Sequence, residues 1–419
     1  MGSPLCSVPS ASPSFKILLV SPSGIGGVQT FCASLAGGFK DMGHLPHVLF
    51  EGPARPQGPG PAMTPGVASS VFHYSPFDNL YRVLRRMAEF FETRAFDFVY
   101  PNTSAVAYRA LGLLGPRRPV AIGGCTGNNA HDYACNTEFA DYLDHIFCAS
   151  AQSVDVLRRN LAGRGVGVTM IPHGIKPAEE APRRSFAGEL GVVFAGRFDP
   201  GKRLQDVVGV SRRLNAQGVP FNLTLAGDGP ERPAVEKACL ECGIGQKVRF
   251  PGFISREEVE SLMRHAHVNL LLSESEGFGL SVLEGMKWGC VPIVTDTCGC
   301  IDVIREGVNG FIVGLGDTGK AAERVLQMDR DRALLARLSA ACERTVREEY
   351  SSDKEVASHL EVLRLAQEHH QHNAARTIPW EYEPPSLINY PWVPNWLARN
   401  LRRLKHRFAA PLRSKAASL

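Results

Sequence analysis

The feature that most constrains this chain is an alternation between short β-branched runs and segments with helical periodicity, which occurs in two series. The first series begins with the apolar run at 15–21 and ends with 168–171, and the second extends from 192–195 to 291–295 before further helical segments. Such alternation is typical of βαβ units in a parallel sheet. The sequence therefore predicts an α/β protein with two doubly wound, Rossmann-like domains.

The boundaries between these parts follow from composition. Proline, glycine and charged residues mix between 173 and 189, which predicts a linker, and a Pro- and Gly-rich stretch at 51–70 predicts a loop. We expect a helix near the end of the chain to pack back across either domain. The chain then has a disordered N-terminus at 1–14, a first domain at 15–175, a second at 190–350, this helix at 351–370 and a basic, aromatic tail at 371–419.

Composition excludes several classes of protein. The net charge of +4 is too small to indicate a nucleic-acid partner, and no run approaches the roughly 20 apolar residues of a membrane span. Met1–Ser14 has no basic residue, so we expect no secretory signal. The 11 scattered cysteines indicate reduced thiols and a cytoplasmic protein. Cys239 and Cys242 have zinc-like spacing without a second pair, so we interpret them as buried helix cysteines and expect no metal site.

The strongest site signal is the segment 273–289, which follows the strand predicted at 268–272. Gly277-Phe278-Gly279 opens a helix, where backbone N–H groups bind anions. Glu276 and Glu284 suit the hydroxyls of a sugar better than a phosphate. The alternatives are a capping box from Ser281 to Glu284 and an exposed loop position for Glu276.

Two further turns carry candidate residues. Arg197 lies at the end of one predicted strand and Lys202 at the start of the next helix, which suits a bound diphosphate, although both can equally be solvated surface residues. Gly26 and Gly27, in the SGIGG turn after the first strand, suit a donor phosphate or an acceptor. The dinucleotide fingerprint is broken there, and the nearest acid that could contact a ribose is Glu51.

Three motifs occur in a fixed order along the second series: a G-R-x4-K segment, a G-x-G-P turn, and two glutamates with seven residues between them. They are formed by Gly196, Arg197 and Lys202, by Gly227–Pro230, and by Glu276 and Glu284. With this order and spacing, 192–315 resembles the retaining GT-B glycosyltransferases of family four, the glycosyl transferases group 1. The first series resembles that family more loosely, through SGIGG and IPHGI.

The resemblance implies a GT-B fold, two domains that face a cleft, and a role for each matching residue. Arg197 and Lys202 would bind the donor diphosphate, Glu276 the transferred sugar and Glu284 the ribose. The base would lie near Phe253 and Ile254. The full set of implied donor-binding residues is Gly26, Gly27, Arg197, Lys202, Phe253, Ile254, Gly277, Phe278, Gly279 and Glu284, and the catalytic set is Glu276, Arg197, Lys202 and His131.

His131 enters this set because the chain departs from the family pattern. Relatives place a histidine after the strand that corresponds to 120–123, where this chain has Cys125 and Thr126. His131 and Asp132 are the nearest residues that supply the missing group, and a surface His-Asp pair is the alternative.

The tail combines arginines with apolar residues at helical spacing. Between 395 and 408 there are five basic residues and no acid, and the apolar positions are Trp396, Leu397, Leu401, Leu404 and Phe408. This pattern is typical of a helix on an anionic membrane surface, which would make the protein peripheral on the cytoplasmic membrane face. The alternatives are a helix docked on its own domain and a disordered tail.

The resemblance thus implies a retaining, metal-independent glycosyltransferase without a cofactor. Its donor would be a UDP-, GDP- or ADP-sugar, and its acceptor a glycan, as in polysaccharide biosynthesis, a lipid-linked sugar or a small molecule. The alternatives are a GT-B nucleotide-sugar epimerase and a non-catalytic protein that binds sugar nucleotides.

Overall fold

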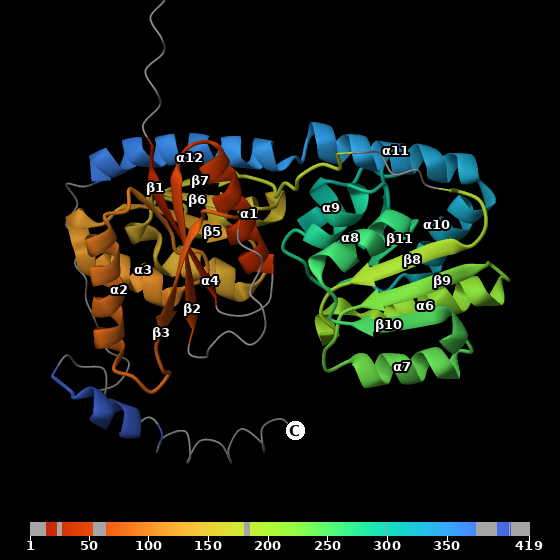
Figure 1. Cartoon of the computed structure of the whole chain (residues 1–419), viewed down its shortest axis with the longest axis horizontal. Helices are drawn as coiled ribbons and strands as arrows, with labels where there is room; N and C mark the ends of the chain where they lie inside the picture. The colour runs from red at the N-terminus through yellow and green to blue at the C-terminus, as the bar shows by residue number, and fades with distance from the viewer. Residues whose placement is uncertain are drawn as a thin grey trace, which may run out of the picture. The chain divides into compact units, whose positions relative to one another are not determined.

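Two parallel β-sheets organise the chain (Figure 1). The computed structural model describes residues 14–22, 27–52, 64–179, 185–297, 299–373, 392–401 and 403. By the contacts between its residues, the chain divides into two compact units, 1–122 with 370–419, and 123–369.

The first sheet has seven strands in the order β3-β2-β1-β4-β5-β6-β7. Its strands are β1 (Lys16–Pro22), β2 (Leu45–Gly52), β3 (Ala68–His73), β4 (Phe98–Tyr100), β5 (Val120–Cys125), β6 (His145–Cys148) and β7 (Gly167–Met170). The helices that connect them are α1 (Gly27–Asp41), α2 (Leu80–Arg94), α3 (Ala105–Leu114), α4 (Ala130–Glu138) and α5 (Ala151–Asn160).

The second sheet has six strands in the order β10-β9-β8-β11-β12-β13, and all of its pairings are parallel. Its strands are β8 (Leu190–Ala195), β9 (Phe221–Ala226), β10 (Val248–Gly252), β11 (Val268–Leu271), β12 (Val291–Thr295) and β13 (Phe311–Val313). The helices that follow β8 along the chain are α6 (Leu204–Ala216), α7 (Arg232–Glu241), α8 (Arg256–His265), α9 (Leu280–Met286), α10 (Thr318–Arg330), α11 (Arg332–Glu348) and α12 (Ser352–Asn373).

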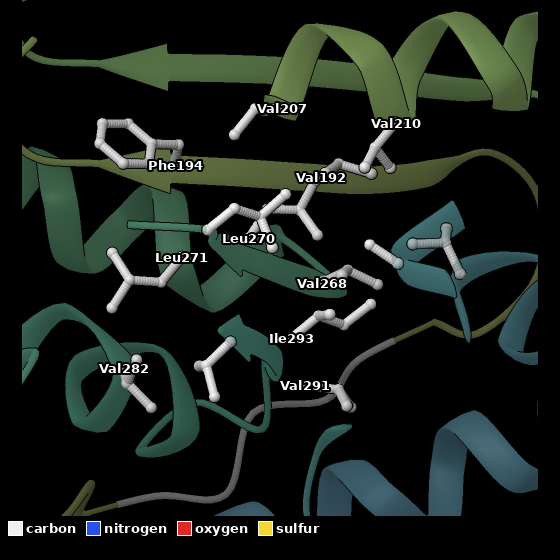
Figure 2. Close-up of a cluster of buried hydrophobic side chains, with 14 of the residues drawn as sticks. Val192, Phe194, Val207, Val210, Val268, Leu270, Leu271, Val282, Val291 and Ile293 are labelled. Carbon is white, nitrogen blue, oxygen red and sulfur yellow. The ribbon is translucent and has the colours of Figure 1, made fainter. Parts of the chain in front are cut away.

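The core of the second sheet explains why its central strands have no polar face. Val192 and Phe194 on β8 and Leu270 on β11 are fully buried beside helix α6, which adds Val207 and Val210 (Figure 2). Helices cover both faces of a doubly wound sheet, so its central strands are continuous apolar runs. The two predicted Rossmann-like sheets are therefore confirmed.

One sequence-based prediction of an element was wrong. The loop expected over 51–70 contains the end of β2, and its last residues begin β3. In the described sheet, β3 is the edge strand and pairs with β2, and among its residues only Phe72 is buried. An edge strand with one small buried face lacks the apolar run by which strands are recognised.

None of the helices in the described part of the chain has the length and apolar character needed to cross a bilayer.

Candidate active site

Residues with predicted roles in donor binding come after three strands of the second sheet, β8, β10 and β11. Arg197 and Lys202 come after β8, Phe253 and Ile254 after β10, and 276–279 after β11. Because these strands are parallel, their carboxyl ends share one edge of the sheet, where open α/β sheets bind ligands. The structure therefore brings these residues to one edge.

The G-x-G-P turn after β9 fits closely against the segment that carries Arg197. Gly227 has a φ of +136°, and a Cβ atom there would lie 1.8 Å from the carbonyl oxygen of Gly196. A Cβ at Gly229, with φ +156°, would lie 2.7 Å from the Phe198 carbonyl oxygen. The Phe198 amide also donates to the Asp228 carbonyl oxygen at 2.9 Å. Only glycine allows this approach, which fixes the backbone on either side of Arg197.

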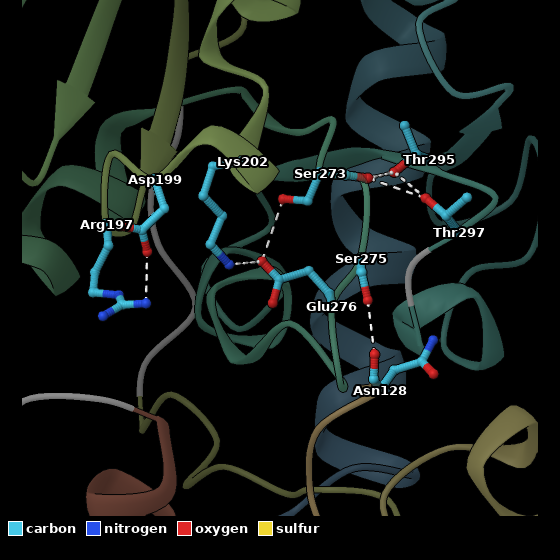
Figure 3. A network of polar contacts seen from close by, with 9 residues as sticks. All are labelled: Asn128, Arg197, Asp199, Lys202, Ser273, Ser275, Glu276, Thr295 and Thr297. Carbon is cyan, nitrogen blue, oxygen red and sulfur yellow. Dashed lines mark hydrogen bonds and ion pairs between the residues drawn. The ribbon is translucent and has the colours of Figure 1, made fainter. Parts of the chain in front are cut away.

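Lys202 and Glu276 form an ion pair between the loops after β8 and β11 (Figure 3). Their side chains are 22% and 16% exposed, so both charges are partly withdrawn from water. The Glu274 amide donates to the Gly201 carbonyl oxygen at 2.8 Å and joins the same two loops. Lys202 lies in a 3₁₀ turn directly before α6, which begins at Leu204.

A row of hydroxyl groups supports Glu276. Ser273 Oγ donates to Glu276 Oε1 at 3.3 Å, and the Ser273 carbonyl oxygen accepts from Thr295 Oγ1 at 2.5 Å and Thr297 Oγ1 at 3.1 Å (Figure 3). Sequence reasoning missed both threonines. Their position at the end of β12, the next strand in the sheet, and just after it was the signal that could have indicated them.

Arg197 extends into solvent at the same edge. Its side chain is 66% exposed, and Nη2 lies 2.6 Å from Asp199 Oδ2 (Figure 3). An exposed ion pair of this kind contributes little to stability. The guanidinium group is thus held in one direction and remains accessible.

Glycines shape the loop that leads into α9. Gly279 is the N-cap of α9 in a left-handed conformation, with no side-chain cap. Ser281 lies inside the helix, so the alternative that it forms a capping box with Glu284 was wrong. The Phe278 ring is 2% exposed within the core, so only its backbone can meet a ligand. A Cβ at Gly277 would lie 2.1 Å from the Thr126 carbonyl oxygen.

Glu284 lies on α9, half-buried and close to charged residues of α8. Burial raises the pKa of its carboxyl group, Arg256 and Lys287 lower that pKa, and Glu260 raises it. Lys287 Nζ donates to Glu260 Oε1 at 2.9 Å. Glu284 is therefore a carboxyl group whose charge is disfavoured by its surroundings.

The remaining predicted donor residues differ in their surroundings. Phe253 is 67% exposed, and Ile254 beside it is half-buried. Gly27 is the first residue of α1 and belongs to the other unit. Gly26 lies outside the described residues.

His131 and Asp132 lie in the first turn of α4, and their environments are unlike. His131 is exposed, and its Nε2 is 3.7 Å from Cys135 Sγ. Asp132 is 4% exposed and accepts a hydrogen bond of 2.6 Å from the Gly127 amide. Burial raises the pKa of Asp132, and the hydrogen bond from Gly127 lowers it. The alternative of a surface His-Asp pair is therefore wrong for Asp132, which closes the loop before α4.

The two cysteines with zinc-like spacing, Cys239 and Cys242, lie at the end of α7. No group of three or more His, Cys, Asp or Glu side chains in the described part of the chain is placed to hold a metal ion. Cys239 is buried on α7, and burial raises its pKa to about 11.

The chain is similar to known glycosyltransferases in sequence. Residues 176–345 match the family model "Glycosyl transferases group 1". N-acetyl-alpha-D-glucosaminyl L-malate synthase of Bacillus anthracis is 32% identical over 168 residues, which are 40% of this chain and 43% of that protein. The putative glycosyltransferase EpsD of Bacillus subtilis (strain 168) is 26% identical over 324 residues, 69% of this chain and 81% of that protein.

Solved structures resemble the chain over more of its length. Anabaena Alr3699/HepE in complex with UDP and glucose has a TM-score of 0.67 at 16% identity, over 84% of this chain and 99% of that chain. Sucrose-phosphate synthase from Thermosynechococcus elongatus has a TM-score of 0.68 at 17% identity, over 84% and 98%. At such identities the likeness shows the fold, which is that of GT-B glycosyltransferases. Residues 176–345 thus match the glycosyl transferases group 1 family within a chain of two Rossmann-like sheets.

Proposed function

We propose that this protein is a retaining glycosyltransferase that moves a sugar from a nucleotide diphosphate-sugar to an acceptor hydroxyl. The observation that carries the proposal is the ion pair of Lys202 and Glu276 at the carboxyl edge of the second sheet. Arg197 and the backbone of 277–279 lie on the loops that hold this pair. A cation, a carboxylate and a glycine-rich helix start together suit a sugar linked to a diphosphate.

Each charged residue of the site has one role in the proposed chemistry. Lys202 and Arg197 bind the diphosphate, while Glu276 accepts hydrogen bonds from sugar hydroxyls and Glu284 from the ribose. The bond between the anomeric carbon and the phosphate oxygen breaks, and its electron pair leaves with the diphosphate, which the two cations stabilise. The acceptor oxygen forms its bond on the face that the phosphate leaves, and its proton passes to the departing phosphate. Because two fixed cations meet the leaving group, we propose that transfer needs no metal ion.

The relatives guide the choice of donor and product. The complexes of Alr3699/HepE with UDP-glucose and with UDP support a UDP-sugar as the first donor to test. The similarity to the lipopolysaccharide core biosynthesis glycosyltransferase LpsE of Rhizobium meliloti, 28% identical over 172 residues, supports a role in polysaccharide assembly.

A thermal-shift screen tests the donor site. Purified protein is mixed with UDP, GDP, ADP and their sugars, beside Arg197→Ala and Glu284→Ala. Matched controls are Arg347→Ala and Glu348→Ala, exposed charges on α11. A ligand at about 100 times its Kd stabilises the folded state by about 2.7 kcal/mol. We expect one base to raise the Tm, and both site variants, but neither control, to lose the rise. No rise with any nucleotide would refute the donor site.

Product analysis then separates the proposed transferase from its alternatives. Incubation of the protein with the donor found in the screen, with EDTA present, should release nucleoside diphosphate and free sugar with the original anomeric configuration. An epimerised nucleotide-sugar would indicate the epimerase. Binding without turnover, even in the presence of acceptor sugars, would indicate the non-catalytic binding protein.

A further inference from the structure

The last described helix of the chain is docked on the start of α2, within one compact unit. Residues 395–401 are helical (Figure 1), and Asn395 Oδ1 accepts from the Asn79 amide at 2.7 Å. Arg399 Nη2 lies 2.6 Å from Asp78 Oδ1, a carboxylate that is 10% exposed. Ala398 is fully buried in this contact. One face of the tail helix is therefore packed against the start of α2, and the opposite face points away from it.

Two indole rings, one just before this helix and one within it, are exposed. Trp392 is 71% exposed and Trp396 is 66% exposed, while Leu397 is half-buried. The apolar stripe predicted from the sequence is thus divided, since Leu397 turns inward and Trp396 outward; Leu404 and Phe408 lie outside the described residues. Two exposed tryptophans within five residues are unusual for a surface in contact with water alone, because burying their area is favourable.

Arginines of α2 lie beside this helix. Arg82, Arg85 and Arg86 are exposed, and together with Asn395 of the tail they line a pocket of about 480 Å³. The acid closest to them on α2 is Glu89, 4.0 Å from Arg85 in a pair of two exposed side chains. The pocket's own acid, Asp78, is already paired with Arg399. The surface therefore carries an excess of positive charge.

We propose that Trp392, Trp396, Arg82, Arg85 and Arg86, here called the Trp–Arg surface, bind the protein to a bilayer of anionic phospholipid. Indole rings favour the headgroup region of a bilayer, and arginines near an anionic leaflet are attracted to it. The pocket between α2 and the tail helix can accept a phosphate headgroup, to which arginine offers paired donors. Charge alone would suit any polyanion, and the two indole rings favour the bilayer. The proposal does not depend on which sugar is transferred or on whether transfer occurs.

Vesicle flotation with the full chain tests this inference. Vesicles of phosphatidylglycerol and phosphatidylcholine are compared with phosphatidylcholine alone, using wild type, Trp396→Ala and the double variant Arg82→Gln, Arg85→Gln. The matched control is Arg344→Gln, Arg347→Gln, two exposed arginines three residues apart on α11. We expect strong binding only to anionic vesicles. The α2 double variant should bind at least tenfold more weakly, since each arginine near such a surface contributes about fivefold.

Each outcome decides the matter, provided that every variant melts at the wild-type temperature. Weaker binding of Trp396→Ala and of the α2 variant, with the control unchanged, supports the Trp–Arg surface. Equal binding to both vesicle types would remove the role of charge and overturn it. Undiminished binding of the site variants, absence of binding, or retention on heparin without binding to vesicles would each overturn it as well.

Discussion

At the scale of single residues, the pairing of Lys202 with Glu276 makes their substitutions differ in effect. In Glu276→Gln, Lys202 loses its partner and becomes more available to a diphosphate, so affinity for the free nucleoside diphosphate should stay equal or rise. Turnover should fall by about 100-fold, because a charged hydrogen bond to the sugar contributes about 1.5–3 kcal/mol. Lys202→Met should instead weaken nucleotide binding by at least tenfold. Calorimetric titration with UDP and initial-rate measurements distinguish these effects.

The control for this pair is Lys237→Met with Glu241→Gln, an exposed ion pair on α7 at 3.6 Å. It should change neither quantity. If Glu276→Gln bound the nucleoside diphosphate much more weakly than wild type, the carboxylate would have to contact the nucleotide rather than the sugar.

A second prediction at this scale concerns Glu284 and the way in which the free energy of unfolding depends on pH. Burial raises its pKa in the folded state, so the folded protein binds this proton more tightly than the unfolded chain and the ionised carboxylate destabilises the fold. Above the folded pKa, Glu284→Gln without ligand should be at least as stable as wild type, and this advantage should vanish as pH falls below 4. Chemical denaturation at pH 7.5 and pH 4 measures it. A large loss of stability at pH 7.5 would show that the carboxylate supports the fold.

At the scale of elements, the turn after β9 should depend on the absence of a side chain. Gly227→Ala places a methyl group 1.8 Å from the Gly196 carbonyl oxygen at a φ of +136°. We expect a loss of about 3 kcal/mol or more in the free energy of unfolding, because both overlap and backbone strain must be relieved. Gly201→Ala, in the turn after β8, is the control, since a Cβ there meets nothing within 4 Å. Equal stability of the two variants would contradict this account of the G-x-G-P motif.

Helix α12 should make the unit 123–369 sensitive to acid. His359 is fully buried against the Phe147 ring, and burial, with nearby His173, lowers its pKa to about 3. Below pH 6.5 the unfolded chain therefore binds a proton that the folded chain does not, so stability falls as pH decreases. The slope from this residue is about 1.4 kcal/mol per pH unit between pH 6 and 4.

Unfolding by urea at several pH values measures this slope. His359→Leu should lower the slope by the contribution of about one proton. The exposed His265→Leu should leave the slope unchanged. Some pH dependence should remain in this variant, because His145, whose pKa burial lowers to about 4, titrates in the same range. An unchanged slope in His359→Leu would mean that His359 is already charged in the folded protein.

The elements also show how far the sequence carries. Helix α8 begins with a capping box of Ser255 and Glu258, a local pattern of the kind that can be read from a sequence. Strand β3 was missed because an edge strand has little apolar character. The contacts of Thr295 and Thr297 depend on the order of β11 and β12 in the sheet, and the docking of Arg399 on Asp78 joins residues far apart in the chain. The periodicity of the sequence contains no information about these contacts, because tertiary packing determines them.

At the scale of the whole molecule, one sheet plan occurs twice, but the predicted residues are divided unequally between the two. The charged donor residues follow strands of the second sheet, whereas His131 follows β5 of the first, on the exposed side of α4. If His131 supplies the group that relatives place after this strand, its loss should affect the reaction and not the binding of nucleotide. We expect His131→Ala to lower kcat by about 10²-fold or more, as loss of a group that assists transfer does, with the Kd for UDP unchanged.

The fold should tolerate this change, because the structural role in the loop belongs to Asp132, whose carboxylate accepts from the Gly127 amide. Asp132→Ala should instead cost about 1–3 kcal/mol of stability, since it leaves a buried donor without its partner. A kcat for His131→Ala equal to that of the exposed control His265→Ala would exclude His131 from catalysis. The site would then rest on Lys202, Glu276 and Arg197, all of which follow strands of the second sheet. A parallel fall in UDP affinity would place His131 at the nucleotide.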